Sequence, residues 1–443
     1  MLSLTPKIVP RYVKRTLILT FLVLSFFSYC QNRSFGTLPL IKTDSIIQSS
    51  EENLNHTDDY KHILNIYEKL VNARGDYRYI VPKLFLKDEV ANVAYIDYNA
   101  NEITFELTAY NVAKKHGDKA IAFLLGHELS HYYEKHAWKN AFAKSNADLK
   151  LGRDLSELQD KVAYETEADY LGGFLAYTAG FGFYQDIGKI IEDLYKAYNF
   201  DPELNGYPSL SDRKELSNRS AKKIESLIDV FDAANLLMAI GKDDAAYKYY
   251  EYILKEFQSR ELYNNIGVLA TRNAMALMDK DSLKFIYVSA LDINFQGSKD
   301  VSIPVNEQIE EGLNQAILHF NAAINLDVNY APAYLNKANV YALKKEYSKA
   351  LFYLNEEAIP CAKKDAVKYA KTLTDAMVLQ GIIAAKTGKV ELAAEKFSEA
   401  KSLGNKLGDT NLDILRNEAK ILQTRFEQQD FFTEKIGAHS LQV

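Results

Sequence analysis

The chain has 443 residues, of which 47% are apolar and 25% are charged, as in ordinary soluble globular proteins. At roughly 100–200 residues per domain, this length predicts two or three domains, each able to form a sizeable core. The net charge of −6 and the pI near 5.9 argue against a general nucleic-acid binder, which would carry a basic excess. We therefore expect no nucleic-acid partner.

The N-terminal segment has the composition of a secretory signal. Basic residues at positions 7, 11, 14 and 15 precede an apolar run, TLILTFLVLSFFSYC, over residues 16–30. We predict a signal peptide over residues 1–36 and a linker over residues 37–56. An uncleaved membrane anchor is the less favoured alternative, because about 15 apolar residues are few for a membrane span. Cys30 could carry a lipid, although the bulky Tyr29 stands where a lipoprotein signal has a small residue.

The chain contains two cysteines, Cys30 and Cys361, which provide no disulfide framework. Export without disulfides is typical of a bacterial periplasmic or envelope protein rather than of a small secreted scaffold. We therefore expect the protein in the periplasm or cell envelope, with peripheral membrane association or a lipid anchor left open.

The segment after the linker alternates between helical and strand-like patterns. YKHILNIYEKLVNAR (residues 60–74) has apolar residues at helical spacing. Three strand-like stretches follow at residues 79–88, 91–99 and 101–107, and the turn signal NAN between the last two predicts a hairpin. One helix is expected from about Ala109. Another is expected over residues 118–138, with Asp118 as its N-cap.

From about Ser226 the sequence changes to recurring helix pairs. Ala316 and Ala350 are 34 residues apart, which is the tetratricopeptide period. Small and aromatic residues recur at that repeat's positions, namely Ala316, Phe320, Ala323, Tyr334, Ala338, Gly381, Ala393, Phe397 and Ala400. The region over residues 226–425 thus resembles about five degenerate tetratricopeptide (TPR) repeats, interrupted near residues 294–305. An unrelated helical bundle is the alternative.

The stretch FLLGHELSHYYEKH (residues 123–136) contains the pattern H-E-x-x-H. His127 and His131 are four residues apart, so both imidazoles project from one face of a helix. Glu128 beside them is placed to take a proton from a water molecule that a metal activates. Ordinary polar residues on a surface helix are the alternative, but the flanking residues are apolar.

A catalytic zinc site needs a third protein ligand and leaves its fourth position to water. Downstream, AYETEADYLGG covers residues 163–173. H-E-x-x-H followed by E-x-E-A-D-x-x-G resembles the gluzincin metallopeptidases of the HtpX and CAAX-prenyl-protease family. The resemblance implies one Zn²⁺ bound by His127, His131 and Glu165. It also implies that Asp169, one helical turn further on, supports a ligand histidine.

Two neighbouring polar residues are not expected to be ligands. Glu167 points about 200° away from Glu165 around the helix. His136 matches a histidine that trails the motif in the family. It lies five residues past His131, off the ligand face, so we expect a structural role for it.

The family often has H-P-x-x-x-x-R further along the chain. The segment YPSLSDR (residues 207–213) keeps the proline and the arginine but has tyrosine in place of histidine. The resemblance implies that Arg213 polarises the substrate carbonyl or orders the site, and that Tyr207 donates to an oxyanion. A plain salt bridge is an equally weighted alternative for Arg213.

The resemblance covers residues 55–222, and the whole layout is similar to the periplasmic BepA type. It implies a mainly α-helical protein with an α+β zincin-type metallopeptidase domain over residues 57–222, which contains a small β-sheet. An α-solenoid of TPR-like pairs and a tail over residues 426–443 would follow. The implied function is zinc-dependent endoproteolysis of envelope proteins, in which the repeats recruit clients or assembly partners. The alternative is a TPR binding or chaperone-like module with a latent metal site.

Other candidate motifs carry no chemistry. No glycine-rich phosphate loop is present, and GGF at residues 172–174 is better explained by close helix packing. The remaining histidines show no ligand spacing.

Overall fold

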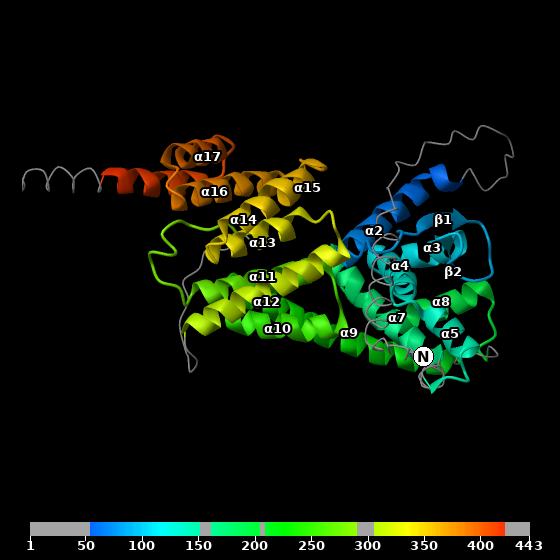
Figure 1. The fold of residues 1–443 in the computed structure, drawn as a ribbon. Coiled ribbons are helices and arrows are strands. Elements are labelled where there is room, and N and C mark those ends of the chain that lie inside the picture. Colours follow the sequence, from blue (N-terminus) through cyan, green and yellow to red (C-terminus); the bar gives the residue numbers. More distant parts are fainter. Residues whose placement is uncertain (1–53, 151–160, 204–208, 290–304, 421–443) are drawn as a thin grey trace, which may run out of the picture. The chain divides into compact units, whose positions relative to one another are not determined.

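The computed structural model describes residues 54–150, 161–203, 209–289 and 305–420, which belong to one compact unit. The predicted signal, Cys30, most of the predicted linker, Tyr207, the predicted interruption up to residue 304 and the C-terminal tail lie outside these residues. The described part is mainly helical with one small sheet, as predicted (Figure 1). None of its helices combines the length and apolar character needed to cross a membrane.

The sheet has three strands, β1 (Lys83–Lys87), β2 (Ala94–Asp97) and β3 (Glu102–Glu106), in the order β1-β3-β2. Strand β1 runs parallel to β3, and β2 runs antiparallel to it, so the predicted hairpin is confirmed. In the connecting turn, the Asp97 carboxylate accepts hydrogen bonds from the backbone N–H groups of Asn99 and Ala100. Because the strand order is β1-β3-β2, strand β2 forms one edge of the described sheet.

Several helices pack against this sheet. A short 3₁₀ turn, η1 (Leu54–His56), precedes α2 (Asp58–Arg74), and α3 (Leu107–Lys115) follows the sheet. The next helix, α4 (Asp118–Tyr133), packs against α2, α3 and α7. Its N-cap is Gly117 rather than the predicted Asp118, which is its first helical residue.

The predicted helix over residues 118–138 is broken in the structure. Helix α4 ends at Tyr133, and Lys135 adopts a left-handed conformation (φ 57°). A new helix, α5 (His136–Ser145), then begins. This break turns the chain just after the H-E-x-x-H segment.

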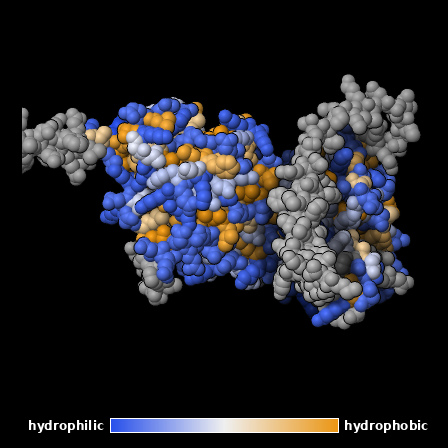
Figure 2. All heavy atoms as spheres, in the orientation of Figure 1, coloured by the Kyte–Doolittle hydropathy of each residue, from blue (hydrophilic) through white to orange (hydrophobic). Residues whose placement is uncertain are grey.

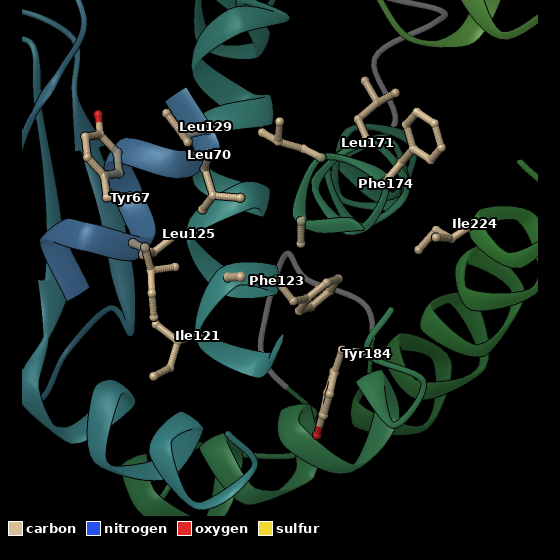
Figure 3. Packing of buried hydrophobic residues seen from close by; sticks show 14 of the residues in the cluster. Tyr67, Leu70, Ile121, Phe123, Leu125, Leu129, Leu171, Phe174, Tyr184 and Ile224 are labelled. Atoms are coloured by element: carbon tan, nitrogen blue, oxygen red, sulfur yellow. The ribbon is translucent and has the colours of Figure 1, made fainter. Parts of the chain in front are cut away.

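The next helices complete the first core. Helix α7 (Lys161–Ala176) continues into a π-helical turn, η2 (Tyr177–Phe181), and α8 (Ile187–Tyr198) follows. The long helix α9 (Leu210–Ala239) packs on both α7 and α8. Figure 3 shows Phe123 of α4, Leu171 and Phe174 of α7 and Ile224 of α9 in one cluster, while Leu125 lies on the side of α4 that faces α2.

The remaining helices follow along the chain, with residues 276–304 between α11 and α12. They are α10 (Asp243–Glu256), α11 (Arg260–Met275), α12 (Val305–Leu326), α13 (Ala331–Leu343), α14 (Tyr347–Phe352), η3 (Tyr353–Ala358), α15 (Ile359–Lys363), α16 (Ala370–Lys386) and α17 (Val390–Ser402). On the face shown in Figure 2, apolar side chains of this region lie scattered among hydrophilic ones.

Two phenylalanines of this region pack on glycines of the preceding helix. A Cβ atom added to Gly267 would lie 2.6 Å from the ring of Phe320, and one added to Gly381 would lie 2.5 Å from the ring of Phe397. Both rings are fully buried. Each aromatic side chain thus fills a space that only a glycine leaves open, at positions where the sequence predicts small and aromatic partners.

Helix α9 crosses the expected boundary between residues 222 and 226 without interruption. The first core also includes residues of α10 and α11, such as Tyr250 and Ile266. The helices after α9 therefore begin as a direct continuation of the first core.

Candidate metal centre

Three helices supply the candidate site. Helix α4 carries His127, Glu128 and His131, α7 carries Glu165 and Asp169, and α9 carries Arg213. The helices α4 and α7 meet at two glycines: a Cβ atom on Gly172 would lie 2.5 Å from the backbone nitrogen of His127 and 2.6 Å from the carbonyl carbon of Gly126. The close packing predicted for GGF is therefore confirmed. It lets a carboxylate of α7 reach the histidines of α4.

The three predicted ligands converge. The Nε2 atoms of His127 and His131 are 3.0 Å apart, and Glu165 places its Oε2 3.5 Å from the first and its Oε1 3.5 Å from the second. Ligand atoms placed tetrahedrally at 2.0–2.1 Å from a zinc ion would be about 3.3 Å apart, close to these separations. Within the part of the chain that the structure describes, this is the one cluster with metal-ligand geometry.

The two imidazoles need a cation or a proton between them. Two Nε2 lone pairs 3.0 Å apart would repel each other. Burial opposes protonation of His127, but the Asp169 and Glu165 carboxylates outweigh it and raise its pKa to about 10. Burial and the charge of His127 lower the pKa of His131 to about 3. At neutral pH and without a metal ion, His127 is therefore protonated and His131 is neutral, so the pair carries one positive charge.

Asp169 orients His127. Its Oδ1 lies 2.9 Å from the His127 Nδ1, so the ring donates from Nδ1 and keeps the Nε2 lone pair for a metal. Asp169 is 1% exposed and also accepts a hydrogen bond from Ser217 Oγ at 3.0 Å. The supporting role expected for Asp169 agrees with this geometry, whereas sequence spacing gave no sign of Ser217.

Arg213 ties the two carboxylates of α7 together. Its guanidinium donates to Asp169 at 2.8 and 3.1 Å and to Glu165 at 3.3 Å. Burial alone would raise the pKa of Glu165, but His127 and Arg213 hold it below its usual value. Of the roles weighed for Arg213, the geometry favours ordering the site through salt bridges over contact with a substrate carbonyl.

Glu128 lies next to the ligand histidines. Burial raises the pKa of its carboxyl to about 7, against the opposing charge of His127. A group with this pKa exchanges protons readily near neutral pH, as a general base requires.

Tyr98, in the turn between β2 and β3, was not singled out by sequence reasoning. Its hydroxyl donates to the His131 carbonyl at 3.3 Å, and its ring stacks on Tyr132. Burial, with the nearby Glu128 charge, raises the pKa of Tyr98 to about 12. A hairpin residue has no fixed spacing to the motif, so no sequence signal identifies it.

His136 interacts with both His131 and Glu167. The His136 Nδ1 lies 2.8 Å from the His131 Nδ1, and its Nε2 lies 3.0 Å from Glu167. Neither belongs to the converging ligand cluster. Tyr207 lies outside the described residues, so its expected oxyanion role stays a prediction.

No protein-family model and no curated protein sequence matches the chain. The functional argument therefore rests on the site itself. Two imidazoles and one carboxylate form a donor set that could hold a divalent metal ion.

Proposed function

We propose that the protein is a zinc-dependent metalloendopeptidase of the cell envelope. His127, His131 and Glu165 would hold the ion. The observation that carries the proposal is the convergence of these three side chains, from helices joined by a glycine contact, beside a carboxyl whose pKa is about 7. A zinc ion bound there would supply a Lewis acid that acidifies water and polarises the scissile carbonyl.

Residues of the chain transfer the proton and position the ligands. Glu128 removes a proton from the attacking water and returns it to the leaving amine, as its pKa near 7 allows. Asp169 keeps the His127 ring in the ligating tautomer, and Arg213 holds Glu165 and Asp169 in place.

The edge of the sheet offers a place for the substrate. Among the described strands, β2 pairs with β3 alone, and it packs against α4, the helix of the metal ligands. An extended polypeptide could add itself to this edge by main-chain hydrogen bonds. A substrate held in this way would be a protein segment or an unfolded chain.

The helical pairs after α9 would recruit clients or partner proteins of the envelope. Their aromatic-on-glycine packing at Gly267 and Gly381 supports a repeat architecture, and stacked helix pairs expose extended binding surfaces. The peptidase would then act on the proteins that these repeats bring to it.

The test is the substitution Glu128→Gln, which removes the base and leaves the ligands. We expect cleavage of casein or a peptide library to fall by about 10²-fold or more, while zinc content stays near one per chain. A chelator should abolish wild-type cleavage, and Zn²⁺ should restore it. Undiminished proteolysis by the Glu128→Gln protein would contradict the role of Glu128 as the general base.

A further inference from the structure

A chain of hydrogen bonds leads from His131 away from the metal site. It passes through His136 to Glu167, at 2.8 and 3.0 Å. His136 is 4% exposed, and its ring stacks on Tyr164 with the centroids 4.4 Å apart. Glu167 is 41% exposed. These hydrogen bonds therefore connect a metal-facing histidine to a carboxylate at the surface.

The direction of these hydrogen bonds follows from both ends. An ionised Glu167 only accepts, so the Nε2 of His136 carries the proton and, in the neutral ring, Nδ1 keeps a lone pair. A histidine that ligates through Nε2 carries its own proton on Nδ1. The Nδ1–H of His131 therefore donates to the Nδ1 of His136. The Glu167 carboxylate at one end and the metal-ligating Nε2 of His131 at the other both require this direction of donation.

The backbone is shaped to make this contact. On an unbroken helix, a residue five positions after His131 would point about 140° away from it. Lys135 instead adopts the left-handed conformation (φ 57°), which is unfavourable for a side chain with a Cβ, and His136 begins a new helix. The turn brings the His136 ring back onto His131, with the centroids 4.8 Å apart.

We propose that His136 and Glu167 are positioning residues that hold His131 with its Nε2 lone pair turned toward the metal. They do for His131 what Asp169 does for His127. The proposal rests on the metal site of the proposed function, although not on peptide hydrolysis. A cation at the Nε2 of His131 makes its Nδ1–H a stronger hydrogen-bond donor. The hydrogen bonds from His131 through His136 to the Glu167 carboxylate, which we call the relay, therefore stabilise the bound ion.

The first measurement is the affinity of the full chain for Zn²⁺, after chelator stripping, in competition with a chromophoric chelator. His136→Phe keeps a ring on Tyr164 but removes the acceptor, and should weaken zinc binding about 10–100-fold. His136→Asn keeps an acceptor oxygen near the Nδ1 position and should restore most of the affinity. Glu167→Gln should weaken binding more than the matched control Asp193→Asn, which alters another histidine–carboxylate pair, with His116, at 3.0 Å.

The second measurement reads the tautomer. In zinc-loaded protein with ¹⁵N-labelled histidine, the Nδ1–H protons of His127 and His131 should both be shifted downfield and slow to exchange. His136→Phe should lose the His131 signal alone. Equal zinc affinity in wild type and His136→Phe, with both signals kept, overturns the relay while the metal site stands. Failure of the wild type to bind Zn²⁺ overturns both proposals.

Discussion

Arg213 contacts both carboxylates of α7, so its loss should affect folding and metal binding together. Arg213→Ala would leave Asp169, which is 1% exposed, without its guanidinium partner. Breaking a buried ion pair from one side costs about 3–5 kcal/mol of unfolding free energy, and we expect a loss in this range. Zinc affinity should also fall, by about 10–100-fold.

Denaturant unfolding of the metal-free protein and a zinc titration measure the two effects. Arg219→Ala is the control on the same helix, because its pair with Glu215 is exposed and should contribute less than about 1 kcal/mol. Equal stability of the two variants would show that Arg213 does not hold Asp169.

The proton on His127 makes metal binding depend on pH. The pKa of His127 is raised to about 10, so below that pH the metal-free site is protonated and zinc must displace a proton. Apparent zinc affinity should therefore rise about tenfold per pH unit toward pH 10 and fall as the pH is lowered.

Calorimetry at pH 8 in buffers of different ionisation enthalpy counts the released protons. Glu128, with its pKa of about 7, is already mostly ionised there and contributes little. We expect one proton per zinc ion from His127, in addition to the proton that a zinc-bound water releases at this pH. Binding without proton release would contradict a protonated His127.

At the scale of elements, the contact of α4 with α7 sets the distance between the ligands. Gly172→Ala would drive a Cβ atom into backbone, 2.5 Å from the His127 nitrogen, which cannot move without shifting α4. We expect a loss of about 1–3 kcal/mol in stability and a weakened zinc site.

Gly173→Ala is the matched control. Its Cβ atom would meet the end of the Ile224 side chain at 2.5 Å, and that end can rotate away. Unfolding curves and zinc content should therefore change less than in Gly172→Ala. Equal zinc loss in both variants would contradict a role for the α4–α7 spacing.

Local patterns predicted the ligand helix and the hairpin well, because both depend on short-range spacing. They placed His127, His131 and Glu165 together through a motif and a resemblance. They could not reveal the break at Lys135, since no glycine or proline marks it. The partners of Arg213 lie 44 and 48 residues away, and such tertiary pairings leave no periodic trace.

At the scale of the whole molecule, Arg260 is a buried junction between distant segments. It is 2% exposed and forms ion pairs with Asp327 and Glu261, while its Nη2 donates to Asn72 of α2 at 2.7 Å. The backbone N–H of Tyr77 donates nearby to the Leu326 carbonyl at 2.7 Å. The first core and the later helices are therefore tied together by polar contacts as well as by the continuous helix α9.

Arg260→Ala should lower the unfolding free energy by about 3–5 kcal/mol, because it leaves Asp327 buried without its partner. It should also split a single calorimetric unfolding transition into two, as the N-terminal core and the later helices melt separately. Lys368→Ala removes an exposed contact to the same Asn72 and is the control. A single, unshifted transition in Arg260→Ala would contradict the junction.

Helix α9 runs without a break through the boundary expected near residue 226 from the start of the helix pairs. Residues 210–239 contain neither glycine nor proline, which agrees with one continuous helix. The change in residue pattern along it marks a change of packing partners rather than a break in the chain.

The glycine pair at the crossing of α4 and α7 also has a use in protein engineering. Because Gly126 and Gly172 position Glu165 by direct backbone contact, the length of chain joining α5 to α7 need not determine where the ligand lies. A reporter tag or an affinity handle inserted in the exposed turn at Ala147 and Asp148, just after α5, should therefore be tolerated.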